Sequence, residues 1–148
     1  MTHALTVCQP FASLIAAGHK FVENRTWPTS YRGPLLIHAG KSRKYLTCCD
    51  ELPGDLPDPL PFGAIVADSE LVECINLDAP VDHGAIERMA AVGITLDEFL
   101  DHEHTEGPWC WILRDVSPLP EPVPCSGRQQ LWKPPHDVLW RVTSQQID

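Results

Sequence analysis

The first third of the chain alternates apolar and polar stretches in a way that predicts three strands, with a short helix between the first and the second. Leu5-Thr6-Val7 predicts the first strand. Gln9-Pro10 opens a helix, because proline suits the first helical position, where its missing amide is no loss. Apolar residues at helical spacing follow until Gly18, which can end a helix in a left-handed conformation.

Residues 21–27 alternate strictly, and the alternation predicts a strand with an unusual face. Two charged groups flanked by two aromatic groups share this face, which suits the wall of a polar cleft: Phe21, Glu23, Arg25 and Trp27. After a turn, the continuous apolar run 35–39 predicts a strand buried on both faces. His38 lies inside it, either as a buried histidine with a backbone partner or at the floor of a cleft.

The remainder of the chain predicts further short elements separated by proline and polar segments. Residues 52–61 are rich in proline and predict a loop. The other predicted elements are a strand from Phe62 to Ile75 that bends near Gly63 and residues 68–70, a helix over 82–91, a helix capped by Thr95 and Glu98, a strand over 109–116, an extended proline-rich linker or sheet edge over 118–124, and a strand over 128–133.

This pattern predicts an α+β fold: a small mixed β-barrel of five to six strands with about three short helices on its outside. Strands and helices do not alternate as in parallel α/β proteins. The 148 residues predict a single domain over 1–148, with its core at about 4–133 and a C-terminal extension at 134–148.

Composition places the chain among globular proteins, since 43% of the residues are hydrophobic and 21% are charged. The sequence has no apolar run of the roughly 18 residues needed to span a bilayer, and its N-terminus lacks a secretory pattern. We therefore expect a soluble, cytoplasmic protein that does not act at a membrane.

The six cysteines predict free thiols, because most of them lie in apolar runs and nothing marks the chain as secreted. There is no C-x-x-C motif, and Cys48 and Cys49 are adjacent, which is poor geometry for zinc. His102-Glu103-His104 is the one dense metal-like cluster in the sequence, and we interpret it as a solvated polar loop. We expect no bound metal and no cofactor.

Charge is segregated along the chain, although the net charge is -9. Residues 1–49 contain six Lys and Arg residues and one acid, whereas residues 50–148 contain five Lys and Arg residues and nineteen acids. Such segregation predicts a localised anion-binding face on an acidic body. The basic loop Lys41-Ser42-Arg43-Lys44 adds to this face, although it lacks the glycines of a Walker motif.

The segment around Lys20 resembles a known family, the ASCH domain, which belongs to the PUA-like barrels. Its G-x-K-x-x-E-x-R hallmark is matched by Gly18, Lys20, Glu23 and Arg25. The neighbouring positions are similar too: Gln9-Pro10, Trp27, Arg32-Gly33-Pro34, the strand 63–66 and Gln130-Leu131-Trp132. The resemblance covers about residues 4–133.

The resemblance implies binding of nucleic acid, usually RNA, or of a modified nucleotide in a basic cleft lined by this motif. Arg25 and Lys20 would meet phosphate, Glu23 would accept from a base amino group or orient Arg25, and aromatic rings would stack on bases. Together with the charge placement, it predicts these ligand-binding residues: Gln9, Lys20, Glu23, Arg25, Trp27, Arg32, His38, Lys41, Ser42, Arg43, Gln130 and Trp132.

Two alternatives remain open. Some relatives resemble amidohydrolases of acetylated cytidine with a Lys-Thr-Glu set, or metal-assisted ribonucleases. Only Lys20 matches that set, because Glu23 stands at the threonine position and Val92 falls near the carboxylate position. Lys20 and Glu23 would be the catalytic pair of such a hydrolase. The other alternative is a protein-interaction module that uses the acidic residues Asp97, Glu98 and Asp101.

Overall fold

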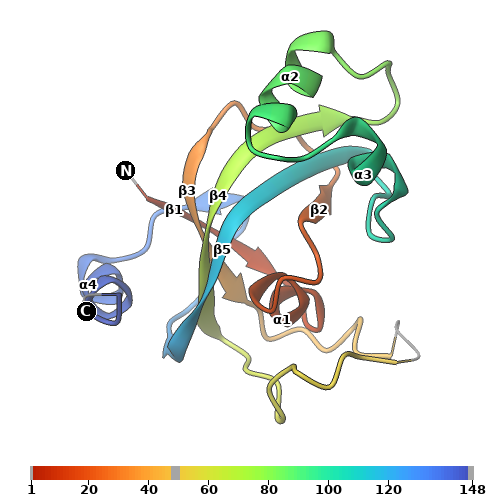
Figure 1. The fold of residues 1–148 in the computed structure, drawn as a ribbon. Coiled ribbons are helices and arrows are strands. Elements are labelled where there is room, and N and C mark those ends of the chain that lie inside the picture. The colour runs from red at the N-terminus through yellow and green to blue at the C-terminus, as the bar shows by residue number, and fades with distance from the viewer. Residues whose placement is uncertain (1, 48–50, 147–148) are drawn as a thin grey trace. The chain divides into compact units, whose positions relative to one another are not determined.

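The structure, a computed structural model, describes residues 2–47 and 51–146 (Figure 1). Its elements in chain order are β1 (His3–Val7), α1 (Phe11–Ala16), β2 (Val22–Arg25), β3 (Gly33–Ala39), β4 (Ala64–Asn76), α2 (His83–Ala91), α3 (Leu96–Asp101), β5 (Trp109–Pro124), β6 (Leu131–Trp132) and α4 (His136–Ser144).

The strands form a mixed, hydrogen-bonded sheet in the order β2-β5-β4-β3-β1-β6. The predicted α+β class, with a barrel-like mixed sheet of five to six strands and short helices, is confirmed. By its internal contacts the chain divides into two compact units. Unit 1 comprises residues 1–19, 34–69 and 116–148, and unit 2 comprises residues 20–33 and 70–115. The single domain and its core boundaries stay predictions.

In unit 1, β1 pairs in parallel with β3 and antiparallel with β6. The apolar run 35–39 is buried along its whole length, as expected for a strand covered on both faces. α1 ends as predicted, since Gly18 adopts a φ of +85°. Its buried positions are Ala12, Ser13, Leu14 and Ile15.

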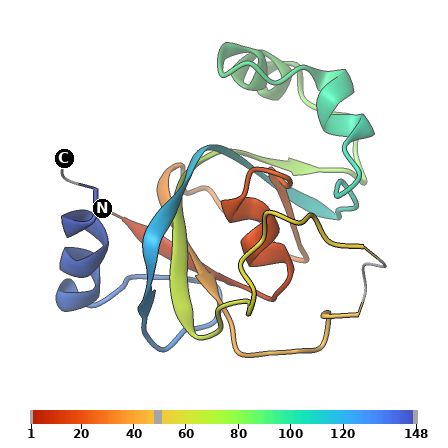
Figure 2. The same cartoon turned by 60° about the horizontal axis from the view of Figure 1, so that its bottom comes forward.

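α4 completes a hydrophobic cluster of unit 1. Figure 2 shows this C-terminal helix on one side of the unit 1 strands and α1 on the other. Val138 and Val142, one helical turn apart, pack with Leu36, Ile65 and Trp132. The sequence pattern predicted no element here, only an extension over 134–148. The diproline at 134–135 ends a strand, as expected, but it also precedes a helix, whose N-terminal cap residue is Pro135.

In unit 2, β2 pairs antiparallel with β5, so that Glu23 lies opposite Trp111. Figure 1 shows α2 and α3 at the end of β4 where β5 begins. Both helices start as predicted: the Asp82 side chain accepts from an amide of α2, and Thr95 and Glu98 form a complete capping box on α3. The core of unit 2 comprises Val22, Ile75, Ala85, Met89, Ile94, Phe99, Cys110 and Ile112.

Two predicted boundaries in unit 1 are wrong. β5 continues to Pro124 instead of ending at residue 116. Prolines at every second position of 118–124 leave the intervening residues with free amide donors, so the strand survives. β6 is only two residues long, because Gln130 has a φ of +59°, which interrupts the strand predicted over 128–133.

The four cysteines in the described residues are free: Cys8, Cys74, Cys110 and Cys125. Burial raises the pKa of the Cys110 thiol to about 11, so this thiol stays protonated at neutral pH. Cys48 and Cys49, also predicted to be free, lie outside the described residues. No helix within 2–47 or 51–146 is long and apolar enough to cross a membrane. The predicted cytoplasmic location stays a prediction.

Candidate functional site

Lys20 is the most buried cation of the predicted site. The residue is only 3% exposed. Its ammonium group donates to the carbonyl of Val22 and, at 3.1 Å, to Oε1 of Glu23. An ammonium group held this way keeps its charge in place without free rotation of the side chain.

Glu23 links Lys20 to Arg25. Oε1 of Glu23 accepts a hydrogen bond from the ammonium group of Lys20, and Oε2 of Glu23 lies 2.9 Å from Nη2 of Arg25. The side chain of Arg25 is 22% exposed, so the set reaches solvent on the arginine side. The structure therefore brings together the three charged motif residues, and the contact of Glu23 with Arg25 agrees with the alternation over 21–27, which did not include Lys20. The three residues form the motif cluster.

Two histidines not predicted as site residues lie near the motif cluster. The ring of His102 packs on Phe21, with 4.3 Å between ring centroids, and lies 5.5 Å from the ring of His104. Burial is the main cause that lowers the pKa of both imidazoles, and the positive charge of Lys20 contributes to it. The sequence prediction of a solvated loop is wrong for His104, whose side chain is 16% exposed.

Asn24 fixes the loop that carries these histidines. Its side-chain amide donates to the carbonyl of His104 at 2.6 Å and accepts from the amides of Glu106 and Gly107.

Within the described ranges, no group of three or more histidine, cysteine or acidic residues is arranged to hold a metal ion.

Trp27 packs inside unit 2. Its ring meets the fully buried ring of Trp111 edge to face at 4.7 Å, and its carbonyl accepts from Nε1 of Trp111 at 3.3 Å. The ring predicted to stack on a base is therefore already in contact with a buried residue of the core.

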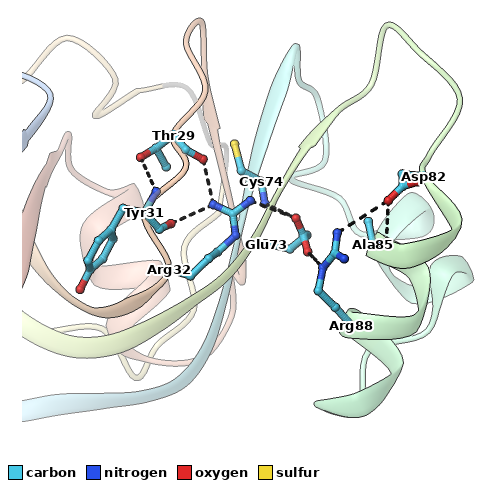
Figure 3. A network of polar contacts seen from close by, with 8 residues as sticks. All are labelled: Thr29, Tyr31, Arg32, Glu73, Cys74, Asp82, Ala85 and Arg88. Atoms are coloured by element: carbon cyan, nitrogen blue, oxygen red, sulfur yellow. Dashed lines mark hydrogen bonds and ion pairs between the residues drawn. The ribbon is translucent and has the colours of Figure 1, made fainter.

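Arg32 belongs to a different charge network, drawn in Figure 3. Glu73, whose side chain is 5% exposed, lies between two guanidinium groups. It accepts from Nη2 of Arg32 at 3.0 Å and from Nε of Arg88 at 2.5 Å. Nη1 of Arg32 donates to the carbonyls of Thr29 and Tyr31. This set is called the Glu73 network.

The Glu73 network is internally neutralised. Burial alone would raise the pKa of Glu73, but hydrogen bonds from Arg88 and Arg32 outweigh burial and hold it below its usual range. Arg88 also lies 3.7 Å from Asp82. The structure therefore gives Arg32, a predicted ligand-binding residue, an internal carboxylate partner.

In unit 1, Gln9 has its polar atoms occupied by the protein itself. Its Oε1 accepts from the amide of Ser13 at 3.0 Å. Its Nε2 donates to the Ser13 hydroxyl and to the carbonyl of Pro61, both at 2.8 Å. The residue is fully buried, and it ties the start of α1 to the proline-rich loop.

Unit 1 contains a hollow of about 420 Å³ beside the predicted basic loop. Lys41 is one of its lining residues, and so is His38. The other lining residues were not predicted as site residues: Thr6, Gly40, Gly63, Ser126, Gly127, Arg128 and Gln129. This space is called the Lys41 hollow.

His38 lines the Lys41 hollow, and Trp132 packs on its ring with 5.5 Å between ring centroids without lining the hollow itself. Nε1 of Trp132 donates to Oγ1 of Thr6 at 3.2 Å, and Nδ1 of His38 lies 3.2 Å from the same hydroxyl. Nε2 of His38 pairs with the carbonyl of Cys125 at 2.8 Å, which makes it the protonated nitrogen. Burial, opposed by this hydrogen bond and reinforced by Lys41, lowers the pKa of His38.

The other predicted residues of unit 1 do not line the hollow. The guanidinium of Arg43 lies 4.3 Å from the ring centroid of Phe62 as a cation–π pair. Ser42 accepts from the amide of Lys44 at 3.3 Å. Gln130 is exposed, while its neighbour Gln129 is the residue that lines the hollow. Arg128 was not predicted from the sequence, and the signal that could have found it is a basic residue directly after a glycine in the acidic part of the chain, Gly127-Arg128.

Comparison with known proteins identifies the family. The profile of the ASCH domain matches residues 5–109. Human "Activating signal cointegrator 1" is 24% identical over 140 residues, and its mouse counterpart is 32% identical over 140 residues. Each alignment covers 87% of this chain and 22% of the relative, so the chain spans about a fifth of the length of these relatives.

Solved structures share the fold at low sequence identity. The crystal structure of ASCH from Zymomonas mobilis aligns with a TM-score of 0.54 and 15% identity, covering 97% of this chain and 94% of that one. The structure of a tyrosine-to-phenylalanine mutant of the same protein aligns with a TM-score of 0.52 and 16% identity, covering 97% and 96%.

Proposed function

The chain belongs to the ASCH domain family, generally RNA-binding domains with a PUA-like fold, and from this membership we propose that it binds RNA or a modified nucleotide through the motif cluster. The proposal assigns contact with the ligand to Arg25 and to the polar groups of Lys20 and Glu23. It invokes no cofactor.

The observation that supports the proposal most strongly is the shared carboxylate of Glu23. Lys20 and Arg25 meet it on separate oxygens, so the guanidinium is oriented before any ligand arrives. A guanidinium oriented in this way can meet a phosphate oxygen or a base edge at a reduced entropic cost. The partial exposure of Arg25 leaves this side chain accessible to solvent.

The distribution of charge supports the same proposal. Residues 1–49 carry an excess of bases on a chain whose net charge is -9. A short basic region predicts few phosphate contacts, and hence weak binding that falls with salt. A long double-stranded ligand fits such a chain less well than a short single-stranded one.

The test is a fluorescence titration with single-stranded RNA at two salt concentrations. We expect Arg25→Gln to weaken binding and to lower the slope of log Kd against log salt by about 1, since one phosphate contact is lost. Arg141→Gln is the control, because it removes one positive charge from the exposed side of α4. Affinity that is indifferent to salt and to Arg25→Gln would exclude the proposal.

A second candidate function is hydrolysis, favoured by the 3.1 Å contact between the buried Lys20 ammonium and Glu23. A lysine in such a place can move a proton for a neighbouring reacting group. An assay over modified nucleosides and single-stranded RNA tests this. Turnover that Lys20→Ala abolishes while ligand binding persists would support hydrolysis, and no turnover of any substrate would exclude it.

A further inference from the structure

The Lys41 hollow differs from the motif cluster and the Glu73 network because no carboxylate among the described residues lies between its cations. Lys41 and Arg128 both line it, although they lie far apart in the sequence. In the part of the chain that the structure describes, neither side chain forms an ion pair. No aspartate or glutamate among the described residues lines the hollow either.

Glycines shape the hollow. A Cβ on Gly63 would lie 2.9 Å from Cε of Lys41, so the missing side chain makes room for the lysine stem. A Cβ on Gly127 would lie 2.7 Å from both Cε1 of His38 and Oγ1 of Thr6. The backbone at Gly127 therefore packs directly against the wall, and it carries Arg128 to the rim.

The side chains that line the hollow are better suited to binding a ligand than to acid-base catalysis. Both ring nitrogens of His38 are engaged, one with Thr6 and the other with the carbonyl of Cys125. A histidine in this state neither accepts nor releases a proton for a ligand without breaking an internal bond. The uncharged polar groups of the lining, among them Ser126 and Gln129, remain as hydrogen-bonding groups beside the two cations.

We infer that the Lys41 hollow binds a phosphomonoester group, as carried by a nucleoside monophosphate or by the phosphorylated end of an RNA strand. A phosphomonoester has a charge of about -2 at neutral pH, which two unpaired cations match, whereas an internal phosphodiester has one negative charge. The volume of about 420 Å³ suits a ligand the size of a nucleotide better than a continuous strand. This inference deepens the proposed function and rests on it for the nucleotide part of the ligand.

The experiment compares ligands with and without the terminal phosphate. Calorimetric titrations use adenosine, adenosine 5′-monophosphate, inorganic phosphate, and one single-stranded RNA synthesised with a 5′-phosphate or a 5′-hydroxyl. We expect the phosphorylated member of each pair to bind at least about tenfold more tightly, since charge-assisted bonds to both cations are lost without it. Comparing the mononucleotide with the phosphorylated strand then distinguishes the two sources of the group.

The double variant Lys41→Gln/Arg128→Gln should abolish this phosphate preference. The matched control, Lys133→Gln/Arg141→Gln, removes the same charge from exposed residues that do not line the hollow and should preserve the preference. Thermal unfolding of both variants checks that they fold. Equal affinity for phosphorylated and unphosphorylated ligands, or a preference that survives in Lys41→Gln/Arg128→Gln, overturns the inference.

Failure of this inference is separable from failure of the proposed function. If the 5′-hydroxyl RNA binds as well as the phosphorylated RNA and still responds to Arg25→Gln, the inference is wrong while the proposed function stands. If adenosine 5′-monophosphate binds with the expected preference but RNA binding ignores Arg25→Gln, the hollow is supported and the role of the motif cluster is excluded.

Discussion

The Glu73 network and the Lys41 hollow each contain two cations, yet they differ in what surrounds the charge. Arg32 and Arg88 share one buried carboxylate, and the hydrogen bonds of that carboxylate are made inside unit 2. Lys41 and Arg128 have no carboxylate beside them among the described residues that line the hollow. The difference indicates that two arginines held on one buried carboxylate serve mainly the fold, whereas cations without a carboxylate beside them keep their charge available to a ligand.

The motif cluster resembles the Glu73 network in form and differs from it in burial. In both, one carboxylate joins two cations. Lys20 is 3% exposed, whereas the Arg88 side chain is 59% exposed. Removing a charge should therefore affect folding most where the carboxylate is buried between cations, and ligand binding most where cations stand alone.

The largest effect is expected at Glu73. Glu73→Gln should lower the free energy of unfolding by about 2 kcal/mol, because charge-assisted hydrogen bonds to two arginines are lost and exposure of the arginines limits the penalty. Urea denaturation measures it. Glu87→Gln, at an exposed carboxylate of α2, is the control and should change stability by less than about 0.5 kcal/mol. Equal effects of the two substitutions would contradict the contrast.

A smaller loss is expected at the wall of the Lys41 hollow. Gly127→Ala should cost about 1 kcal/mol, because the new methyl group meets His38 and Thr6 at 2.7 Å and the wall must shift. Gly54→Ala is the matched control, since nothing lies within 4 Å of its added Cβ. Thermal unfolding of both variants measures the difference in stability between them. A Gly127→Ala protein as stable as the Gly54→Ala control would contradict the close packing at Gly127.

Acidification should weaken the fold through its buried histidines. Burial lowers the pKa of His38, His102 and His104 from 6.5, so below that pH the unfolded chain binds protons that the folded chain resists. The contribution of these neutral histidines to the free energy of unfolding should be fully present above pH 6.5. It should fall as the pH drops from 6.5 toward their lowered pKa values in the folded protein. Urea denaturation at about pH 7.5, 6.5 and 5.5 measures the loss, and His38→Gln should reduce it. A flat profile would show that the rings protonate freely.

The smallest change in stability is expected at the cations of the hollow. Lys41→Gln and Arg128→Gln should each alter the free energy of unfolding by less than about 0.5 kcal/mol, because exposed, unpaired side chains contribute little to the fold. Denaturation curves of the two variants beside Glu73→Gln complete the comparison. A loss as large as that of Glu73→Gln would reveal a structural role for these cations.

Elements with complete local signals were predictable from the sequence. The capping box of Thr95 and Glu98 satisfies both partners within four residues, and α3 begins there. Alternation across 21–27 placed Glu23 and Arg25 on one face of a strand, and the two side chains meet. In both cases the neighbours that decide the structure are close in sequence.

Features that depend on distant partners were not predictable. No local pattern brings Arg32 and Arg88 to Glu73, which is 41 and 15 positions away from them. α4 becomes part of a core through Val138 and Val142. Some of their partners, such as Ala4 and Leu36, lie more than a hundred residues earlier in the chain, while Trp132 is close in sequence. The Lys41 hollow likewise needs Lys41 and Arg128 from separate stretches.

The Glu73 network also determines how this part of the protein responds to reductants and to salt. It joins three stretches of unit 2 that are remote in sequence, as a covalent cross-link would, while the cysteines of the described residues are free. Thiol reductants would cleave a disulfide but leave this electrostatic tie intact. High salt weakens the network mainly on the exposed side of Arg88, because the buried Glu73 carboxylate is screened much less.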